Sequence, residues 1–73
     1  MIIQTRDGKI YWMVRHAIDA MEEDNLFEHD IQKVLENAAP QVSDSSERDI
    51  YIYNRVAVVV DENDNIVTGY RIS

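Results

Sequence analysis

The feature that most constrains the fold of this 73-residue chain is an uninterrupted apolar run, Val56 to Val60. Because the run has no polar position, it is typical of a strand covered by its neighbours rather than one with a face in water. Turn-forming residues fill positions 61–65, and a second strand-like segment follows. In that segment one face is predicted to carry Ile66, Thr68, Tyr70 and Ile72. Together the two segments predict an antiparallel hairpin at the centre of a sheet.

A third strand precedes this hairpin. Residues 49–53 alternate Ile with Tyr, and Asn54-Arg55 supplies a tight reversal. The predicted meander is therefore 49–53, 56–60 and 66–72. We expect the face formed by Ile50 and Ile52 to meet the helices. Tyr51 and Tyr53 then line a face that is either partly open or covered by the N-terminal hairpin with Trp12. Asp7-Gly8, between two apolar segments, indicates a further N-terminal hairpin, unless Ile10 to Met13 simply leads into the first helix.

Two amphipathic helices are predicted between residues 14 and 38. The buried stripe of the first, at helical spacing, is Val14, Ala17, Ile18 and Met21. The inner face of the second is Phe27, Ile31, Val34, Leu35 and Ala38, and Pro40 ends it. The first helix is predicted to end near Asp24-Asn25, where Asn can serve as a left-handed cap. The short link at Asn25 and Leu26 predicts an αα-hairpin. Residues 41–47 are predicted to be a polar loop. The expected fold is one α+β domain, 1–73, with two N-terminal helices on a three- to four-stranded antiparallel sheet.

Charge and composition limit the kinds of partner that the protein can bind. The net charge is −7, from fourteen acidic and seven basic residues. An acidic surface repels nucleic acid and favours basic protein partners. The chain has no cysteine for a disulfide or a thiolate zinc site, and no apolar run of membrane-spanning length. We therefore expect a cytoplasmic protein with a protein partner. The acidic side chains Asp19, Glu22 and Glu23 on the first helix are a candidate docking surface, or simply a solvated face.

No metal or cofactor site is predicted. Asp61, Asn63 and Asn65 resemble the start of a calcium loop. That loop requires glycine at its sixth position and an acid at its twelfth, where this chain has Ile66 and Ile72. The segment is therefore interpreted as a solvated turn.

The candidate catalytic residues are His16, Thr68, Tyr70 and Arg71. A histidine at the edge of a helix–sheet junction can act as a general acid or base near neutral pH. The competing interpretation is that His16 is structural and that Thr68 and Tyr70 are ordinary strand formers.

The helices and strands also suggest a family. The segment RHAIDAMEEDNLFEHDIQKVLENA, followed by three strands ending IVTGY, resembles small bacterial domains related to the RelE/ParE and BrnT-type toxin fold. In that resemblance His16, Ala17 and Met21 match the first-helix motif, and Thr68 and Tyr70 match a T-x-Y ending. The family's arginine before the methionine is Ala20 here. The resemblance implies the fold, and it implies RNA cleavage in some members and only partner binding in others.

Two functions follow as hypotheses. The first is a non-catalytic interaction module that binds a protein through its acidic helix face or its tyrosine-bearing sheet face. The alternative is a metal-independent ribonuclease that uses His16 as general acid or base, with Thr68, Tyr70 and Arg55 or Arg71 positioning phosphate. The missing arginine and the acidic surface favour the first, because a polyanion needs cationic groups to neutralise it.

Overall fold

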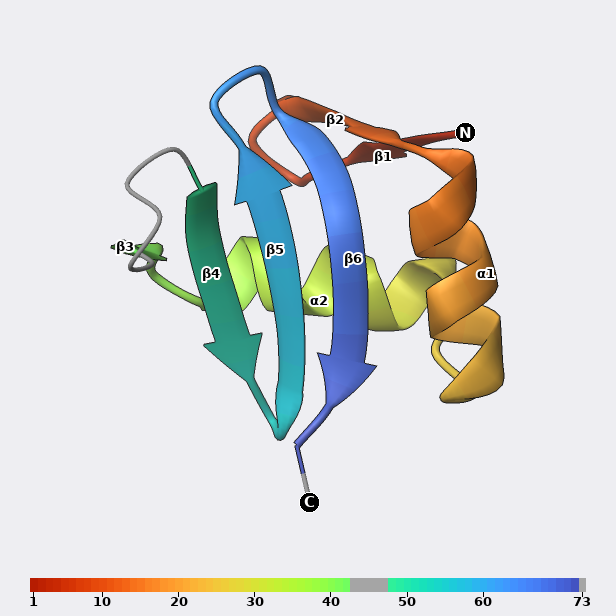
Figure 1. The fold of residues 1–73 in the computed structure, drawn as a ribbon. Helices are drawn as coiled ribbons and strands as arrows, with labels where there is room; N and C mark the ends of the chain where they lie inside the picture. The colour runs from red at the N-terminus through yellow and green to blue at the C-terminus, as the bar shows by residue number, and fades with distance from the viewer. Residues whose placement is uncertain (43–47, 73) are drawn as a thin grey trace.

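The computed structural model describes residues 1–42 and 48–72, and it shows an α+β fold in which a curved sheet packs on two helices (Figure 1). The elements are, in chain order, β1 (Ile2–Gln4), β2 (Ile10–Met13), α1 (Arg15–Glu23), α2 (Glu28–Asn37), β3 (Gln41–Val42), β4 (Arg48–Tyr53), β5 (Val56–Asp61) and β6 (Asn65–Arg71). The predicted loop 41–47 begins with β3, and residues 43–47 lie outside the described residues.

The sheet has the order β1-β2-β6-β5-β4-β3. The predicted meander forms its centre as β4, β5 and β6, all antiparallel. The hairpin that Asp7-Gly8 indicated is confirmed as β1 and β2. Two other expectations were wrong: this hairpin, and not the helices, comes first in the chain, and β2 pairs with β6 in parallel, so the sheet is mixed rather than antiparallel. The turn of this hairpin contains Gly8 at φ 92°, a conformation that glycine adopts without strain.

The side of the sheet that meets the helices is the opposite of the predicted one. Tyr51 pairs with Val58, and both are buried in the core beneath the helices. Ile52 pairs with Ala57 on the other side and keeps 41% of its surface exposed. A fully apolar strand such as β5 does not reveal which of its sides meets the helices. The predicted orientation therefore rested on β4 alone, where Ile was assigned inside and Tyr outside.

A β-bulge in β6 changes the predicted alternation of that strand. Thr68 pairs with Val59 and Ile66 pairs with Val60, which leaves Val67 without a partner. The extra residue reverses the side to which the start of the strand points. Ile66 is consequently fully buried on the helix side with Gly69, whereas Thr68 and Tyr70 remain on the opposite side.

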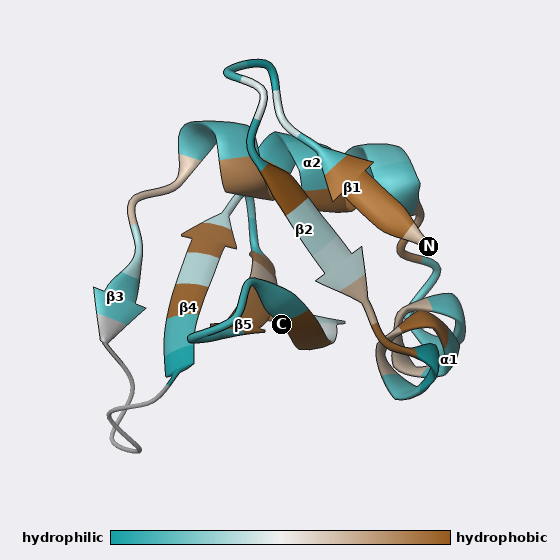
Figure 2. Cartoon of the chain, turned by 90° about the horizontal axis from the view of Figure 1, so that it is seen from above, coloured by the Kyte–Doolittle hydropathy of each residue, from teal (hydrophilic) through white to brown (hydrophobic). Residues whose placement is uncertain are grey.

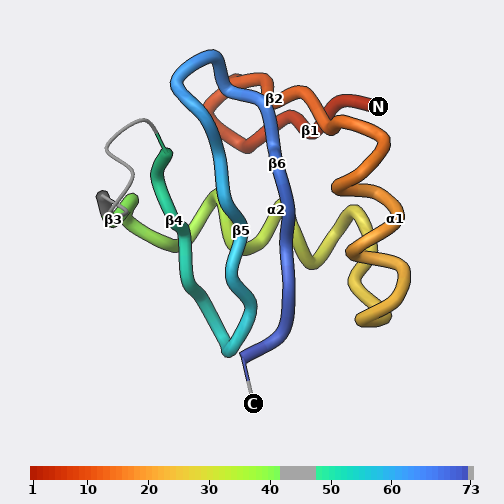
Figure 3. The backbone as a smooth tube through the Cα atoms, in the orientation of Figure 1, coloured from red at the N-terminus to blue at the C-terminus, as the bar shows by residue number. Residues whose placement is uncertain are grey.

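Both helices pack on the sheet rather than on one another, so the predicted αα-hairpin does not form. Helix α1 lies alongside β6, and α2 crosses behind β4 and β5 in a different direction (Figures 2 and 3). The link between the helices is a Schellman motif: the N–H of Leu26 donates to the carbonyl of Met21 at 2.8 Å, and the N–H of Asn25 donates to that of Glu22 at 3.1 Å. Asn25 has φ 56°, as its predicted left-handed cap requires.

The predicted helix stripes are mostly confirmed. Ala17 and Met21 of α1 are buried, as are the α2 residues Ile31, Val34 and Leu35. The exceptions are Val14 and Phe27, which precede the helices as N-caps and remain 39% and 56% exposed.

Candidate functional site

The side of the sheet that faces away from α2 is the most extensive apolar surface that β4, β5 and β6 present. We call it the outer face and define it by Ile50, Ile52, Ala57, Val59, Thr68 and Tyr70. In Figure 1 it is the side of these three strands turned toward the viewer, with α2 behind.

Strand register arranges the outer face in rows. Ile52, Ala57 and Tyr70 form one row, in which the small Ala57 is completely covered between its neighbours. Ile52 and Tyr70 themselves are 41% and 42% exposed. Side chains of this size normally lie inside a small domain, so a row that leaves two of them open indicates a surface suited to contact with another molecule.

Charge is nearly absent from the outer face. Within the described strands β4 to β6, alternation places only Arg48 and Asp61 on this side, opposite one another at one end. The Asp61 carboxylate accepts hydrogen bonds from the N–H groups of Asn63 at 2.8 Å and Asn65 at 2.9 Å. The pKa of Asp61 is lowered, chiefly by the hydrogen bond from the Asn65 N–H. Asp61 therefore stabilises the turn.

Trp12 is a further exposed aromatic side chain, at the end of the outer face that carries Asp61. It pairs with Asn65 across the parallel β2–β6 contact, and its N–H donates to the carbonyl of Asp64 at 2.9 Å. Its neighbours Tyr11 and Met13 are buried on the inner side, so Trp12 points outward and is 56% exposed. The sequence pattern predicts Ile52 on the side that meets the helices and assigns Trp12 no binding role. Trp12, the chain's one tryptophan, lies in a short segment that alternates with buried residues, and this signal could have identified it.

The predicted catalytic residues do not form a cluster. Thr68 and Tyr70 share the outer face, whereas Arg71 lies on the side that meets α1. His16 is exposed on α1, and among the described residues no hydrogen bond joins it to any of these side chains. Asp19, three residues further on, is instead paired with Arg15 at 3.5 Å. General acid–base chemistry needs its groups within hydrogen-bond reach, directly or through one water.

Arg71 has a structural task. Its Nε donates to the backbone carbonyl of Asp24 at 3.0 Å and its Nη2 donates to that of Asn25 at 3.3 Å. Its own N–H donates to the Asp24 carboxylate at 3.2 Å. A cation at these carbonyls satisfies acceptors that the end of α1 leaves open and complements the helix dipole. Arg71 therefore links the end of α1 to β6, and its guanidinium already forms hydrogen bonds there.

The predicted binding residues Tyr51 and Tyr53 behave differently. Tyr51 is 8% exposed, and its ring meets that of Tyr11 edge-on, with centroids 6.5 Å apart. Burial, followed by a hydrogen bond with Tyr11, raises the pKa of Tyr51 well above the ordinary tyrosine value. Tyr51 is thus a core residue and no part of an open face. Tyr53, at the end of β4, is 41% exposed. The other predicted binding residues, Asp19, Glu22 and Glu23, are exposed on α1.

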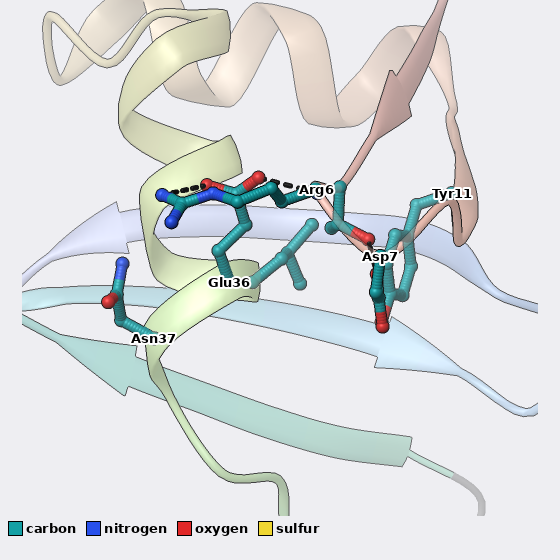
Figure 4. Close-up of a pocket in the computed structure, with 7 residues that line it drawn as sticks. Arg6, Asp7, Tyr11, Glu36 and Asn37 are labelled. Carbon is teal, nitrogen blue, oxygen red and sulfur yellow. Dashed lines mark hydrogen bonds and ion pairs between the residues drawn. The ribbon is translucent and has the colours of Figure 1, made fainter.

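A polar pocket of about 220 Å³ lies between the β1–β2 turn and the end of α2 (Figure 4). Its polar groups pair with one another. The Glu36 carboxylate accepts from the backbone N–H of Arg6 at 2.6 Å and lies 3.6 Å from the Arg6 guanidinium, and the Thr5 hydroxyl donates to Asp7. These contacts hold the hairpin against α2. The side chains that line the pocket are therefore engaged in attaching the hairpin to α2.

The described residues form neither a metal-binding cluster nor a membrane-spanning helix. Within residues 1–42 and 48–72, no three histidine, aspartate or glutamate side chains come together as a metal site would require. In the same part of the chain, neither helix has the length and apolar composition needed to cross a lipid bilayer.

The chain matches no protein-family model, no curated protein and no solved structure. The RelE/ParE and BrnT-type resemblance therefore stays a prediction. The class of protein that the fold and surface define is a small α+β domain with an uncovered apolar sheet face.

Proposed function

We propose that this protein is a non-catalytic interaction module that binds another protein through its outer face. The observation that carries the proposal is the open row of the sheet, in which Ile52 and Tyr70 are each about two-fifths exposed on an almost uncharged surface. Burying apolar side chains of this kind stabilises a complex by roughly 25 cal/mol for each Å² removed from water. Trp12 is exposed at the other end of the outer face, and tryptophan and tyrosine are the residues on which binding energy most often depends.

The distribution of charge supports binding of a protein at this face rather than a nucleic acid. Phosphate binding needs several Lys or Arg side chains on one surface. The outer face of β4 to β6 has Arg48 alone, and Asp61 lies opposite it. The ribonuclease alternative has no specific observation in its favour, since Arg71 is engaged at the end of α1 and His16 has no partner among the proposed catalytic groups.

Site-specific photo-crosslinking tests the proposal. A photoreactive amino acid is placed at position 52 or 70 on the outer face, and at Glu62 in the β5–β6 turn as a control. In cells that express the chain, we expect one discrete protein adduct from positions 52 and 70 and none from position 62. A second substitution, Tyr70→Lys, should abolish the adduct from position 52, whereas Glu62→Lys should leave it intact.

The proposal would be refuted if positions 52 and 70 gave no discrete adduct, or if position 62 gave the same one. Equal amounts of adduct in the Tyr70→Lys and Glu62→Lys backgrounds would also refute it, because the outer face would then be irrelevant to the contact.

A further inference from the structure

A second apolar surface lies on the helix side of the molecule, away from the outer face. It is a groove of about 80 Å³ between α1, the start of α2 and the N-terminal hairpin. Its apolar lining is formed by Met1, Met13, Ile18, Met21, Leu26 and Phe27. All three methionines of the chain therefore line it. The flexible methionine side chain adapts its shape to what it contacts, so such surfaces suit the binding of a peptide.

The groove is lined by buried side chains at its base and by an exposed side chain at its rim. Met13, Met21 and Leu26 are 8%, 1% and 2% exposed, whereas Phe27 is 56% exposed. Phe27 is the N-cap of α2, a position that favours Ser, Thr, Asp or Asn, and its ring offers the helix no acceptor. The capping contact that exists runs from its backbone N–H to the Asp30 carboxylate at 3.0 Å. The exposed ring thus contributes little to the helix and forms the rim of the groove.

The size of the groove restricts its occupant. Its 80 Å³ is well below the roughly 150 Å³ of an apolar cavity that accepts a benzene ring. The space therefore suits a single aliphatic side chain better than an aromatic ring. The lining is apolar at its floor, so the side chain that enters must be apolar as well.

The rim is acidic. Glu22 and Glu28 line the groove and are exposed, and neither forms an ion pair or side-chain hydrogen bond among the described residues. Residues 15–30 contain six carboxylates and one arginine, and that arginine pairs with Asp19. A partner that places positive charge on both sides of its apolar side chain therefore complements the rim. A second copy of this acidic chain would bring like charges together there.

We propose that this groove binds a segment of a partner protein in which an aliphatic side chain is flanked by Lys or Arg residues. The aliphatic side chain enters between Met13, Met21 and Leu26, and the flanking cations pair with Glu22 and Glu28. The inference rests on the proposed function in one respect, that the ligand is a protein, and it concerns a different surface from the outer face.

Methionine-methyl NMR tests the proposal, because each of the three methionine methyl groups reports on the groove. The probe is the blocked pentapeptide Lys-Lys-Leu-Lys-Lys, added to protein labelled at the methionine methyl carbons. We expect saturable shifts of the Met13 and Met21 signals. The analogues Glu-Glu-Leu-Glu-Glu and Lys-Lys-Gly-Lys-Lys, which lack the charge or the apolar side chain, should produce none.

Charge-matched variants supply the control. Glu22→Gln with Glu28→Gln should weaken binding of the pentapeptide about three- to tenfold, as expected for two exposed ion pairs, and added salt should weaken it further. Asp49→Asn with Glu62→Gln removes the same charge elsewhere on the surface and should leave the affinity unchanged.

Three results would overturn the inference: no saturable shift with the cationic peptide, equal shifts with the acidic one, or equal weakening in both double variants. Methionine shifts that depend on protein concentration without peptide would assign the groove to a second copy and would also overturn it. Failure here leaves the outer face untouched, because crosslinking from position 52 tests that surface separately.

Discussion

Tyr51 and Tyr53 offer a matched test of how far the helices cover the inner side of β4, on which both side chains lie. They are the same residue type, two positions apart in one strand, and their alternation with Ile predicted a shared, partly open face. In the structure Tyr51 is 8% exposed and packs against Tyr11, whereas Tyr53 is 41% exposed at the end of the strand. Replacement of each by alanine deletes the same atoms from two different environments.

The expected costs differ several-fold. Removing a buried aromatic side chain costs about 3–5 kcal/mol of unfolding free energy, because it combines lost burial with a cavity. A chain of this length has a total stability of roughly 4–11 kcal/mol at about 0.05–0.15 kcal/mol per residue. Tyr51→Ala should therefore remove a third or more of the stability and lower the Tm by about 15–30 °C. Tyr53→Ala loses a contact that is already largely solvated and should cost about 1 kcal/mol.

Urea denaturation followed by circular dichroism measures both costs. If Tyr51→Ala does not fold, Tyr51→Phe supplies the comparison. It removes only the hydroxyl, in surroundings that raise its pKa, and should cost about 1 kcal/mol, against almost nothing for Tyr53→Phe. Equal losses in the two alanine variants, or a larger loss for Tyr53→Ala, would contradict the burial of Tyr51 in the core.

Four further outcomes are expected. The pKa of Tyr51 is raised in the folded state, so its contribution to stability is complete below the unfolded tyrosine pKa of about 10 and declines as the pH rises above that value. In alkaline denaturation, Tyr51→Phe should reduce this decline. One of the four tyrosines should accordingly stay un-ionised in ultraviolet titration until the protein unfolds. Gly69→Val should lower the unfolding free energy by about 1–3 kcal/mol, since a Cβ there would lie 2.8 Å from the Met21 Cε, and an unchanged thermal transition would contradict this packing. Arg71→Gln should increase hydrogen exchange at the end of α1, whereas Arg55→Gln should not. Purified protein should cleave RNA no faster than its His16→Ala variant, and a loss of cleavage on that substitution would restore the ribonuclease hypothesis.

The sequence predicted the elements well because each has a strong local signal. The Val56–Val60 run, the helical stripes through Met21 and Ile31, and the cap at Asn25 all appear where periodicity and turn chemistry place them. The three central strands agree with their predicted bounds to within one residue.

The errors concern relations that local pattern does not encode. No local pattern in β6 indicates that Val67 is an extra residue, yet this one bulge moves Ile66 into the core. The parallel pairing of Trp12 with Asn65 joins segments more than fifty positions apart in the chain, and short apolar segments give no signal for it. Alternation with Ile50 and Ile52 predicts Tyr51 on a partly open face, but its buried ring finds an edge-on aromatic partner in Tyr11, more than thirty positions away in the chain.

The candidate site was harder to predict than the fold. The outer face is defined by cross-strand rows, so Ile52 and Tyr70 become neighbours of Ala57 only after the register is known. Arg71 was assigned to phosphate because arginine beside Tyr70 fits that role in sequence. Its engagement with the end of α1 depends on a contact across 46 positions of the chain.

Cysteine accessibility tests the central claim most directly, because the chain has no cysteine of its own. Ile52→Cys places a unique thiol on the outer face, and Glu62→Cys places one in the exposed β5–β6 turn. With purified protein, we expect both thiols to react with a soluble maleimide. Inside cells that express the chain, position 52 should be protected while position 62 remains reactive. Equal reactivity of the two thiols in cells would show that nothing covers the outer face and would contradict the account.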